Sequence, residues 1–311
     1  MKQDLRRAAE ILRAGGLVAF PTETVYGLGA DASSADAVAR LYRTKGRPED
    51  HPVIIHFSSA ENAFEWGREI PAAARKLAAR FWPGPLTLVV KRSAKAKDFV
   101  TGAQDSVGLR VPSHPIAQAL LREFGSGVAA PSANVFGHVS PTTAQHVRDD
   151  FPGRVDLVLE GGASEVGIES TIVDLSDGAA TLLRPGGISK ARLEEVLDSK
   201  VTDKKSGSPR HSGGLERHYA PQTPAVLVAP HQLDAEIGKR HAAVAVLAFS
   251  RPDERVEYWI RMPREPQAYA QRLYAALREL DGAQCETILI EMPSETAEWT
   301  AVRDRLSRAT G

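Results

Sequence analysis

The sequence contains a single cysteine, Cys285, among its 311 residues. An intrachain disulfide and a zinc site built from several cysteines are therefore both excluded. The nine histidines are scattered without the spacing of metal ligands. No apolar run approaches the ~20 residues that cross a bilayer, and the N-terminal residues lack the apolar core of a secretory signal. We expect a cytoplasmic protein with no membrane segment and no metal held by protein side chains.

An excess of charge of one sign is also missing, because 39 basic residues balance 39 acidic ones. Net charge therefore does not indicate nucleic acid as the main ligand, although a local basic patch remains compatible with it. The phosphate-binding pattern G-x-x-x-x-G-K-[ST] does not occur. Residues 27–32 fit G-x-G-x-x-A, but the apolar strand ends at Phe20, whereas a dinucleotide site needs its glycines directly after the strand. H-E-x-x-H and G-x-S-x-G are absent as well.

The length predicts about two domains of roughly 100–200 residues each. Strand and helix patterns interleave along the chain, which is typical of an α/β protein, and several consecutive strands without a helix between them predict a mixed sheet. The composition changes near residue 200, where Lys, Ser, Gly and Pro replace apolar residues. We expect a larger domain with a twisted mixed sheet over residues 1–200, a linker over 201–223 and a smaller, Rossmann-like α/β domain over 224–311.

Polar loops follow or precede several of the predicted strands, where α/β proteins place their ligands. Each loop alone has an ordinary explanation as a turn, a helix cap or the site of an internal ion pair. Six such segments occur, at residues 20–29 (FPTETVYGLG), 44–48 (TKGRP), 106–112 (SVGLRVP), 129–134 (AAPSAN), 168–174 (IESTIVD) and 183–187 (LRPGG).

The cations in these loops indicate a kind of chemistry. Lys45 and Arg47 flank a glycine, and either complement a helix C-terminus or clamp a polyphosphate. Arg110 lies in an apolar strand pattern, where a guanidinium is costly to bury unless a carboxylate of the protein or of a ligand pairs with it. We see no pair of nucleophile and base. The pattern therefore favours phosphoryl or nucleotidyl transfer, which works by positioning and charge neutralisation.

Nine segments, in this order, resemble the YrdC-like domain over about residues 5–198: FPTETVYGLG, KGRP, HPVIIH, FWPGPLTLV, VGLRVPSHP, PSAN, SPT, ESTIVD and LRPGG. Residues 211–221 (HSGGLERHYAP) and the small domain after them are similar to the long, two-domain form of the L-threonylcarbamoyladenylate synthase family. The resemblance implies a nucleotidyltransferase that makes L-threonylcarbamoyl-AMP and pyrophosphate from L-threonine, bicarbonate and ATP. Mg²⁺ would be bound by the phosphates of ATP and not by protein side chains. Partner proteins, the tRNA-modifying threonylcarbamoyl transferase machinery, would use the product.

The resemblance also implies roles for individual residues. Those expected to hold L-threonine are Thr24, His56, Arg110, the backbone of Ala130, and Ser170. Those expected to hold ATP are Arg47, His51, Ser106, Ser132, Ser140 and Arg184, with His218 and Tyr219 folding over the nucleotide as a lid. Lys45, Arg47, Ser132 and Asn134 are expected to serve catalysis directly.

Two positions depart from the family pattern, since His51 stands where Asn is frequent, and Ser212-Gly213-Gly214 stands where Ser-Pro-Gly is frequent. Three other functions were weighed. A carbamoyltransferase-type maturation protein is disfavoured, because such chains are usually much longer and carry cysteine-rich segments, and this chain has one cysteine. The alternatives that remain are a module that binds double-stranded RNA or tRNA without synthase activity, and an ATP hydrolase or regulator that needs no threonine.

Overall fold

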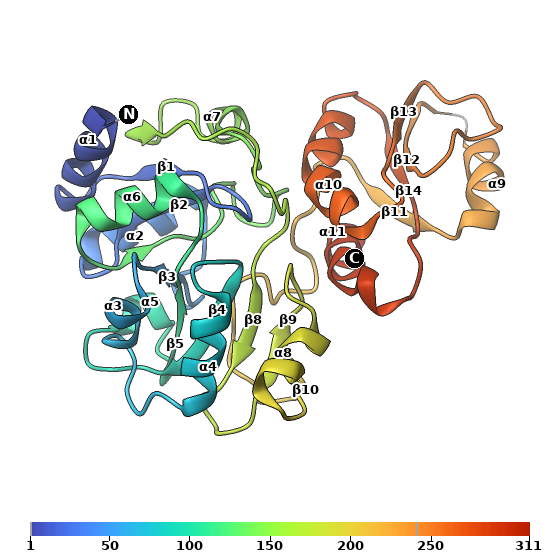
Figure 1. Ribbon diagram of the computed structural model, residues 1–311. Helices are drawn as coiled ribbons and strands as arrows, with labels where there is room; N and C mark the ends of the chain where they lie inside the picture. The colour runs from blue at the N-terminus through green and yellow to red at the C-terminus, as the bar shows by residue number, and fades with distance from the viewer. Residues whose placement is uncertain (1, 241) are drawn as a thin grey trace.

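The computed structural model describes residues 2–240 and 242–311. Two separate β-sheets divide these residues into two bodies, which Figure 1 shows as a blue-to-yellow part and an orange-to-red part. This arrangement confirms the prediction of an α/β protein with a large mixed sheet followed by a smaller α/β domain.

The first sheet has ten strands and mixes parallel with antiparallel pairs. In spatial order the strands are β10 (Thr202–Asp203), β9 (Thr181–Arg184), β8 (Thr171–Asp174), β4 (Leu86–Lys91), β5 (Ser106–Arg110), β3 (Ile54–His56), β6 (Val128–Ala129), β2 (Gly27–Asp31), β1 (Val18–Phe20) and β7 (Leu157–Val158).

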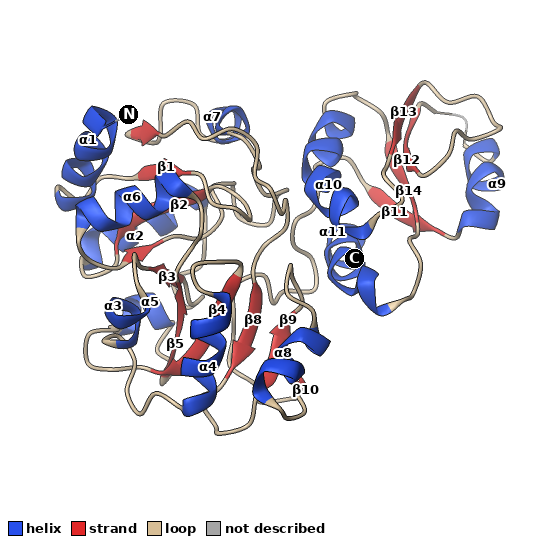
Figure 2. Cartoon of the chain, in the orientation of Figure 1, coloured by secondary structure: helices blue, strands red, loops and turns tan. Residues whose placement is uncertain are grey.

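Helices cover this sheet, as Figure 2 shows. They are α1 (Lys2–Arg13), α2 (Ala35–Lys45), α3 (Ala60–Phe64), α4 (Ala72–Phe81), α5 (Asp98–Thr101), α6 (Pro115–Phe124), α7 (Ala144–Asp150) and α8 (Lys190–Leu197). Helix α2 matters for the site. The Ser34 hydroxyl accepts a hydrogen bond from the Ala37 N–H at its start, and Gly46 ends it with a left-handed φ of 65°. The chain therefore turns sharply between Lys45 and Arg47.

The period-two pattern of β1 explains why the sheet has a core on each face. Leu17 and Ala19 point into the larger core, which includes α2 and α4, whereas Val18 and Phe20 point into the core beneath α1 and α6. All four side chains are fully buried. Because β1 packs into a core on each face, its end is fixed in position, and the polar loop that follows Phe20 begins there.

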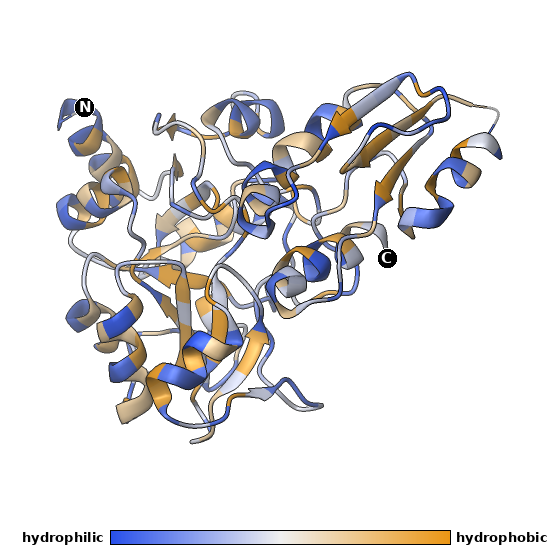
Figure 3. Ribbon diagram, turned by 45° about the vertical axis from the view of Figure 1, so that its right-hand side comes forward, coloured by the Kyte–Doolittle hydropathy of each residue, from blue (hydrophilic) through white to orange (hydrophobic). Residues whose placement is uncertain are grey.

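The second sheet has four parallel strands in the order β11 (Ala225–Val228), β14 (Thr287–Glu291), β12 (Val244–Ala248) and β13 (Tyr258–Arg261). The short 3₁₀ turn η1 (Pro230–Gln232) and α9 (Leu233–Gly238) follow β11, and apolar residues of α9 pack on one face of the sheet. On the other face pack α10 (Pro266–Asp281), the turn η2 (Ala297–Trp299) and α11 (Thr300–Thr310). Figure 3 shows apolar strands between helices that carry their polar residues outward.

Two details differ from the sequence analysis. Residues 20–29 were interpreted as one loop, but Gly27–Asp31 forms β2, which pairs with β1 and β6. A side chain at Gly29 would lie 2.9 Å from both Phe20 and Val128, so glycine is needed there because neighbouring side chains approach the backbone closely. The predicted linker also begins with a short strand, β10, which extends the first sheet.

Candidate active site

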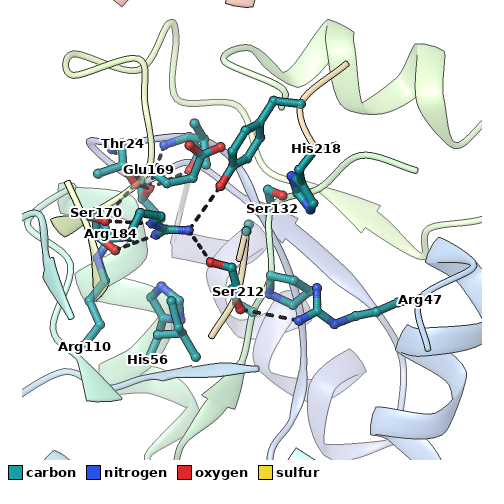
Figure 4. Close-up of a pocket in the computed structure, with 18 residues that line it drawn as sticks. Thr24, Arg47, His56, Arg110, Ser132, Glu169, Ser170, Arg184, Ser212 and His218 are labelled. Carbon is teal, nitrogen blue, oxygen red and sulfur yellow. Dashed lines mark hydrogen bonds between the residues drawn. The ribbon is translucent and has the colours of Figure 1, made fainter. Parts of the chain in front are cut away.

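A pocket lies where several strand ends and loops of the first domain meet residues 211–221. Figure 4 shows its polar side chains converging from separate elements. Parallel strands β3 and β5 end side by side, so His56 and Arg110 are partners in register. Eighteen residues line the pocket; of those expected to bind substrates, they include Thr24, Arg47, His56, Arg110, Ala130, Ser132, Ser170, Arg184, His218 and Tyr219.

Arg110 is buried beside a carboxylate of the protein itself. Its Nη2 atom donates to Glu23 Oε1 at 2.7 Å and to the Thr24 hydroxyl at 2.9 Å. The second oxygen of Glu23 accepts the Ser113 backbone N–H. The Nε atom of Arg110 is buried and has no hydrogen-bond partner among the described residues. One edge of this guanidinium is therefore fixed, and the Nε donor remains for a further acceptor.

His56, next to Arg110, is held in its neutral form. Burial and the charge of Arg110 place the pKa of the imidazole well below its ordinary value. Its Nδ1 atom is buried without a partner among the described residues. A neutral imidazole between a cation and the pocket can exchange a hydrogen bond with a polar ligand but adds no charge of its own.

Arg47 and Lys45 lie at the end of α2 but face different surroundings. Arg47 lines the pocket, where its Nη2 atom donates to the Pro52 carbonyl at 2.6 Å and to the Ser212 hydroxyl at 3.4 Å. Lys45 is buried behind the pocket wall and donates to the backbone carbonyls of Ser132 and Asn134. Burial, with the charge of Arg47, holds the pKa of Lys45 well below its ordinary value. Lys45 therefore ties α2 to the loop that presents Ser132.

Arg184, at the end of β9, connects the sheet to residues 211–221. Its Nε and Nη2 atoms donate to the backbone carbonyl and the hydroxyl of Ser170 at 3.1 and 3.2 Å. Its Nη1 atom donates to the Ser212 carbonyl at 2.9 Å and to the Tyr219 hydroxyl at 3.3 Å. Figure 4 shows this fan of hydrogen bonds around Arg184. A side chain at Gly213 would lie 1.9 Å from the Tyr219 hydroxyl, so the segment can pass here only as glycine.

Five expected site residues are not among those that line the pocket. Ser140 donates to Glu169, which does line it, and Asn134 accepts from Lys45 through its carbonyl. His51 packs on Phe136, with ring centroids 5.4 Å apart, and Phe136 in turn packs on His218. Ser106 lies at the other end of β5 from Arg110, which is about 13 Å for four residue steps along a strand. The fifth is Lys45.

The structure also brings in residues that were not predicted to belong to the site. Glu169 lines the pocket and accepts hydrogen bonds from Ser140, Tyr274 and Arg305. Burial alone would raise the pKa of Glu169, but the charges of Arg305 and Arg184 and the bond from Ser140 hold it below its ordinary value. The position of Glu169 in the ESTIVD segment was the feature of the sequence that could have identified it as a site residue. Phe136 had no such signal, because a lone aromatic residue in a loop has no informative periodicity.

The described residues contain no group of three or more His, Cys, Asp or Glu side chains that could hold a metal ion. In the same part of the chain, 2–240 and 242–311, no helix is long and apolar enough to cross a membrane.

A pocket at the strand ends of an α/β domain that gathers three arginines and several hydroxyls is suited to anionic substrates and is typical of a group-transfer enzyme. Residues 10–186 match the family described as "Telomere recombination", which comprises the Sua5, YciO and YrdC proteins. Residues 188–311 match the family described as "Threonylcarbamoyl-AMP synthase, C-terminal domain". The chain belongs to the Sua5/YciO/YrdC family, in the form that carries this C-terminal domain.

Relatives and solved structures agree with this assignment. Threonylcarbamoyl-AMP synthase of Pyrococcus abyssi is 39% identical over 99% of this chain and 94% of its own length. The Bacillus subtilis protein of the same name is 37% identical over 99% of this chain and 93% of its own. The crystal structure of Pyrococcus abyssi Sua5 complexed with L-threonine covers 100% of this chain with a TM-score of 0.92 and 37% identity. A second solved form, with a histidine and the tyrosine after it both replaced by alanine, also has a TM-score of 0.92.

Proposed function

We propose that this chain synthesises threonylcarbamoyl-AMP from L-threonine, bicarbonate and ATP, with release of pyrophosphate. The observation that carries the proposal is one pocket with two cationic regions, Arg110 on one side and Arg47 with Arg184 on the other. The full length of the chain is similar to synthases of this product. That similarity favours an enzyme over a module that only binds RNA.

We infer that L-threonine binds at the ends of β3 and β5. Its carboxylate would accept from the free Nε of Arg110, because this buried donor lacks a partner among the described residues. Thr24, neutral His56, Ser170 and the Ala130 backbone complete the proposed subsite. The solved relative that contains L-threonine supports a site for this amino acid in the family.

ATP is placed between the loop after α2 and residues 211–221. Arg47 and Arg184 are the two pocket cations that remain after Arg110, and planar guanidinium groups suit phosphate oxygens. Ser132 and Ser140 would contribute hydroxyls, and Lys45 would hold the Ser132 loop in place through its two carbonyl contacts. Asn134, His51 and Ser106 are proposed to contact the nucleotide, at its edges. His218 and Tyr219 are proposed to close over it, in accord with the relative in which a His-Tyr pair was replaced.

The reaction follows from these two subsites. The neutral amine of threonine forms a bond to the carbon of bicarbonate, and a carbon–oxygen bond breaks as water leaves with a proton of the amine. An oxygen of the resulting N-carboxylate attacks the α-phosphorus of ATP. The new oxygen–phosphorus bond forms as the bond to the bridging oxygen breaks, and its electron pair leaves with pyrophosphate. The nucleophile is already an anion, so no general base is required. Arg47 and Arg184 would neutralise the growing charge. Mg²⁺ held by the phosphates would supply further neutralisation.

The product is a mixed anhydride with a good leaving group, so a transferase must consume it. We infer that the consumer is the machinery that modifies tRNA with threonylcarbamoyl groups, and that the reaction takes place in the cytoplasm. Direct contact with tRNA is not required for the synthesis itself, in accord with the zero net charge of the chain.

The test is pyrophosphate release by purified protein with ATP, Mg²⁺ and bicarbonate, with and without L-threonine, while nucleotide products are identified by mass spectrometry. Threonine-dependent release together with the mass of threonylcarbamoyl-AMP is expected. Release without threonine would indicate a hydrolase instead, and tRNA binding without any turnover would favour the RNA-binding alternative. Omission of bicarbonate tests whether the carbamoyl carbon comes from that ion.

A further inference from the structure

Arg305 of α11 is the largest fully buried side chain of the described residues, with an exposed fraction of 0%. A buried guanidinium is destabilising unless its hydrogen bonds and charge are compensated. Apart from the adjacent Asp304, its partners belong to the other domain. The Nε atom donates to Glu169 Oε2 at 2.7 Å, and Nη2 donates to the backbone carbonyls of Glu169 at 3.3 Å and Pro185 at 3.0 Å. Arg305 thus fixes α11 against the start of β8 and the end of β9.

The carboxylate of Glu169 gathers contacts from both domains. Besides Arg305, it accepts the hydroxyl of Tyr274 from α10 at 2.9 Å and the hydroxyl of Ser140 at 2.6 Å. Glu169 also lines the pocket. Any movement of α10 and α11 away from the first domain would therefore leave the Glu169 carboxylate without two of its donors, Tyr274 and Arg305.

Tyr219 lies against the same cluster. The guanidinium carbon of Arg305 is 5.3 Å from the centre of the Tyr219 ring, and Tyr274 packs on that ring with centroids 5.8 Å apart. Tyr219 has a left-handed φ of 62°, a conformation that is unfavourable for a residue with a bulky side chain and persists where surrounding contacts impose it. Arg305 and Tyr274 provide those contacts, and the hydroxyl of Tyr219 faces Arg184.

Helix α11 also holds the backbone on either side of residue 217. The His218 N–H donates to the Arg308 carbonyl at 3.0 Å, and the Arg308 side chain donates to the Leu215 carbonyl. Three positions of residues 211–221 are therefore fixed by the same helix, whereas Arg47 and Arg184 hold the segment only at Ser212 and Tyr219.

We propose that Arg305 is a positioning residue for ATP turnover: through Tyr219 and Glu169, helix α11 of the C-terminal domain holds residues 211–221 over the nucleotide subsite. This inference rests on the proposed function and gives the C-terminal domain a defined part in it. Arg305 touches no substrate. Its effect should be much larger on ATP utilisation than on threonine binding, because Arg305 packs directly on Tyr219 but comes near the threonine subsite only through Glu169, the residue before Ser170.

The experiment compares Arg305→Met and Tyr274→Phe with Arg303→Met in the full-length chain. Arg303 lies on the same helix but donates to Pro293 and Glu295 of its own domain, so its replacement is the matched control. We expect kcat/KM for ATP to fall roughly 10- to 100-fold in Arg305→Met and about fivefold in Tyr274→Phe, within the usual range of coupling between sites. L-Threonine affinity, measured by calorimetry, should stay within about twofold of the parent value. Substitutions at sites that are not in contact usually act independently, and Arg305 does not contact the residues assigned to threonine. Arg303→Met should match the parent protein in both.

Limited trypsin digestion supplies a readout independent of turnover. Lys204, Lys205 and Arg217 are exposed in and beside the segment. ATP should protect these sites in the parent protein and in Arg303→Met but not in Arg305→Met. Arg305→Lys, which keeps the charge but not the planar fork, should give an intermediate result.

The inference is overturned if Arg305→Met retains parental ATP kinetics and protection, or if threonine affinity falls in parallel with ATP utilisation, as general destabilisation would produce. If Arg305→Met does not fold, Tyr274→Phe decides, because it removes one hydroxyl and keeps the ring. If the parent protein shows no threonine-dependent pyrophosphate release, the proposed function is contradicted instead. The role of Arg305 is then still tested by whether ATP protects the trypsin sites in the parent protein but not in Arg305→Met.

Discussion

Arg110 and Glu23 form an ion pair inside the first domain, with 2.7 Å between Nη2 and Oε1 and with side chains only 5% and 4% exposed. Sequence reasoning left open whether the carboxylate partner of Arg110 would come from the protein or from a ligand. In the structure the partner is a carboxylate of the protein, that of Glu23. The Nε atom of Arg110 has no partner among the described residues and can still donate to a carboxylate of a ligand. Glu23 therefore holds the guanidinium in one orientation before any substrate arrives, which lowers the ordering cost of binding.

Replacing Arg110 should weaken threonine binding selectively. Loss of a hydrogen bond between charged groups costs about 1.5–3 kcal/mol, which corresponds to roughly a 10- to 150-fold increase in Kd. Titration calorimetry with L-threonine measures this for Arg110→Ala and for Arg110→Lys, which keeps a cation beside Glu23. Arg92→Ala, at an ion pair with the exposed Asp98, is the control. An unchanged threonine Kd in both Arg110 variants would remove Arg110 from the threonine subsite.

Arg47→Ala should nearly abolish pyrophosphate release, because it removes one of the two cations assigned to the phosphates. We expect a fall of roughly 100-fold or more in kcat, the size seen when one preorganised charge-stabilising donor is lost. Arg43→Ala is the matched control, since Arg43 lies four residues earlier and is exposed at the surface of α2. Circular dichroism and melting curves should be parental for both variants. If Arg47→Ala releases pyrophosphate at the parental rate, the assignment of Arg47 to the phosphates of ATP is wrong.

Gly213→Ala tests whether residues 211–221 must approach Arg184 closely. The added carbon would lie 1.9 Å from the Tyr219 hydroxyl and 3.1 Å from Arg184, so the segment must shift and KM for ATP should rise about tenfold or more, as expected for a close-packed site forced to rearrange. Gly207→Ala provides the comparison. It has a similar left-handed φ of 89° but nothing within 4 Å. Equal effects of the two substitutions would show that backbone strain alone, and not the contact with Tyr219, is responsible.

ATP utilisation should depend on pH through two buried histidines. Burial lowers the pKa of His211 to about 4, with help from the charge of Arg184. Burial likewise lowers the pKa of His218 to about 3; Glu169 opposes this shift, and Arg47, Lys45 and Arg184 add to it. Exposed imidazoles have a pKa of about 6.5. Both rings are thus neutral when the segment is closed, and their contribution to closure is complete above about pH 6.5 and is lost progressively as the pH falls below it.

The expected result is a KM for ATP that rises as the pH falls from about 6.5 to 5, with a threonine Kd that changes little over that range. His211→Gln should flatten part of this dependence. His231→Gln, at an exposed position of the second domain, should leave the parental profile. A profile that is flat in the parent protein would mean that the two histidines stay buried throughout turnover.

The sequence was informative where local pattern decides structure. The apolar run before residue 21 predicted β1, and the glycine between Lys45 and Arg47 predicted the end of α2. Ten of the residues that were expected to bind substrates line one pocket of the structure. Their convergence depends on strand order, which brings β3 beside β5 and β9 beside β8. Spacing along a chain does not specify that order.

Long-range contacts explain what sequence reasoning missed. Residues 20–29 are predicted as a polar loop after a buried strand, yet Gly27–Asp31 forms β2, and close neighbours require glycine at Gly29. Arg305 was not singled out by any sequence motif, and only tertiary packing buries it beside Glu169. Phe136 gained its place between His51 and His218 in the same way.

Ser212 contacts both arginines that are assigned to the phosphates, Arg47 through its hydroxyl and Arg184 through its carbonyl. ATP must replace these protein oxygens before it can use the same donors. Its apparent affinity is therefore reduced by the fraction of molecules in which Ser212 keeps these two donors, whereas the contacts of α11 with Leu215, His218 and Tyr219 need not change. Substitutions near position 212 would shift the nucleotide concentration at which the enzyme is half-saturated and leave the threonine subsite as it is. Among related chains, sensitivity to the cellular supply of ATP can then diverge through a few linker residues while the pocket walls stay the same.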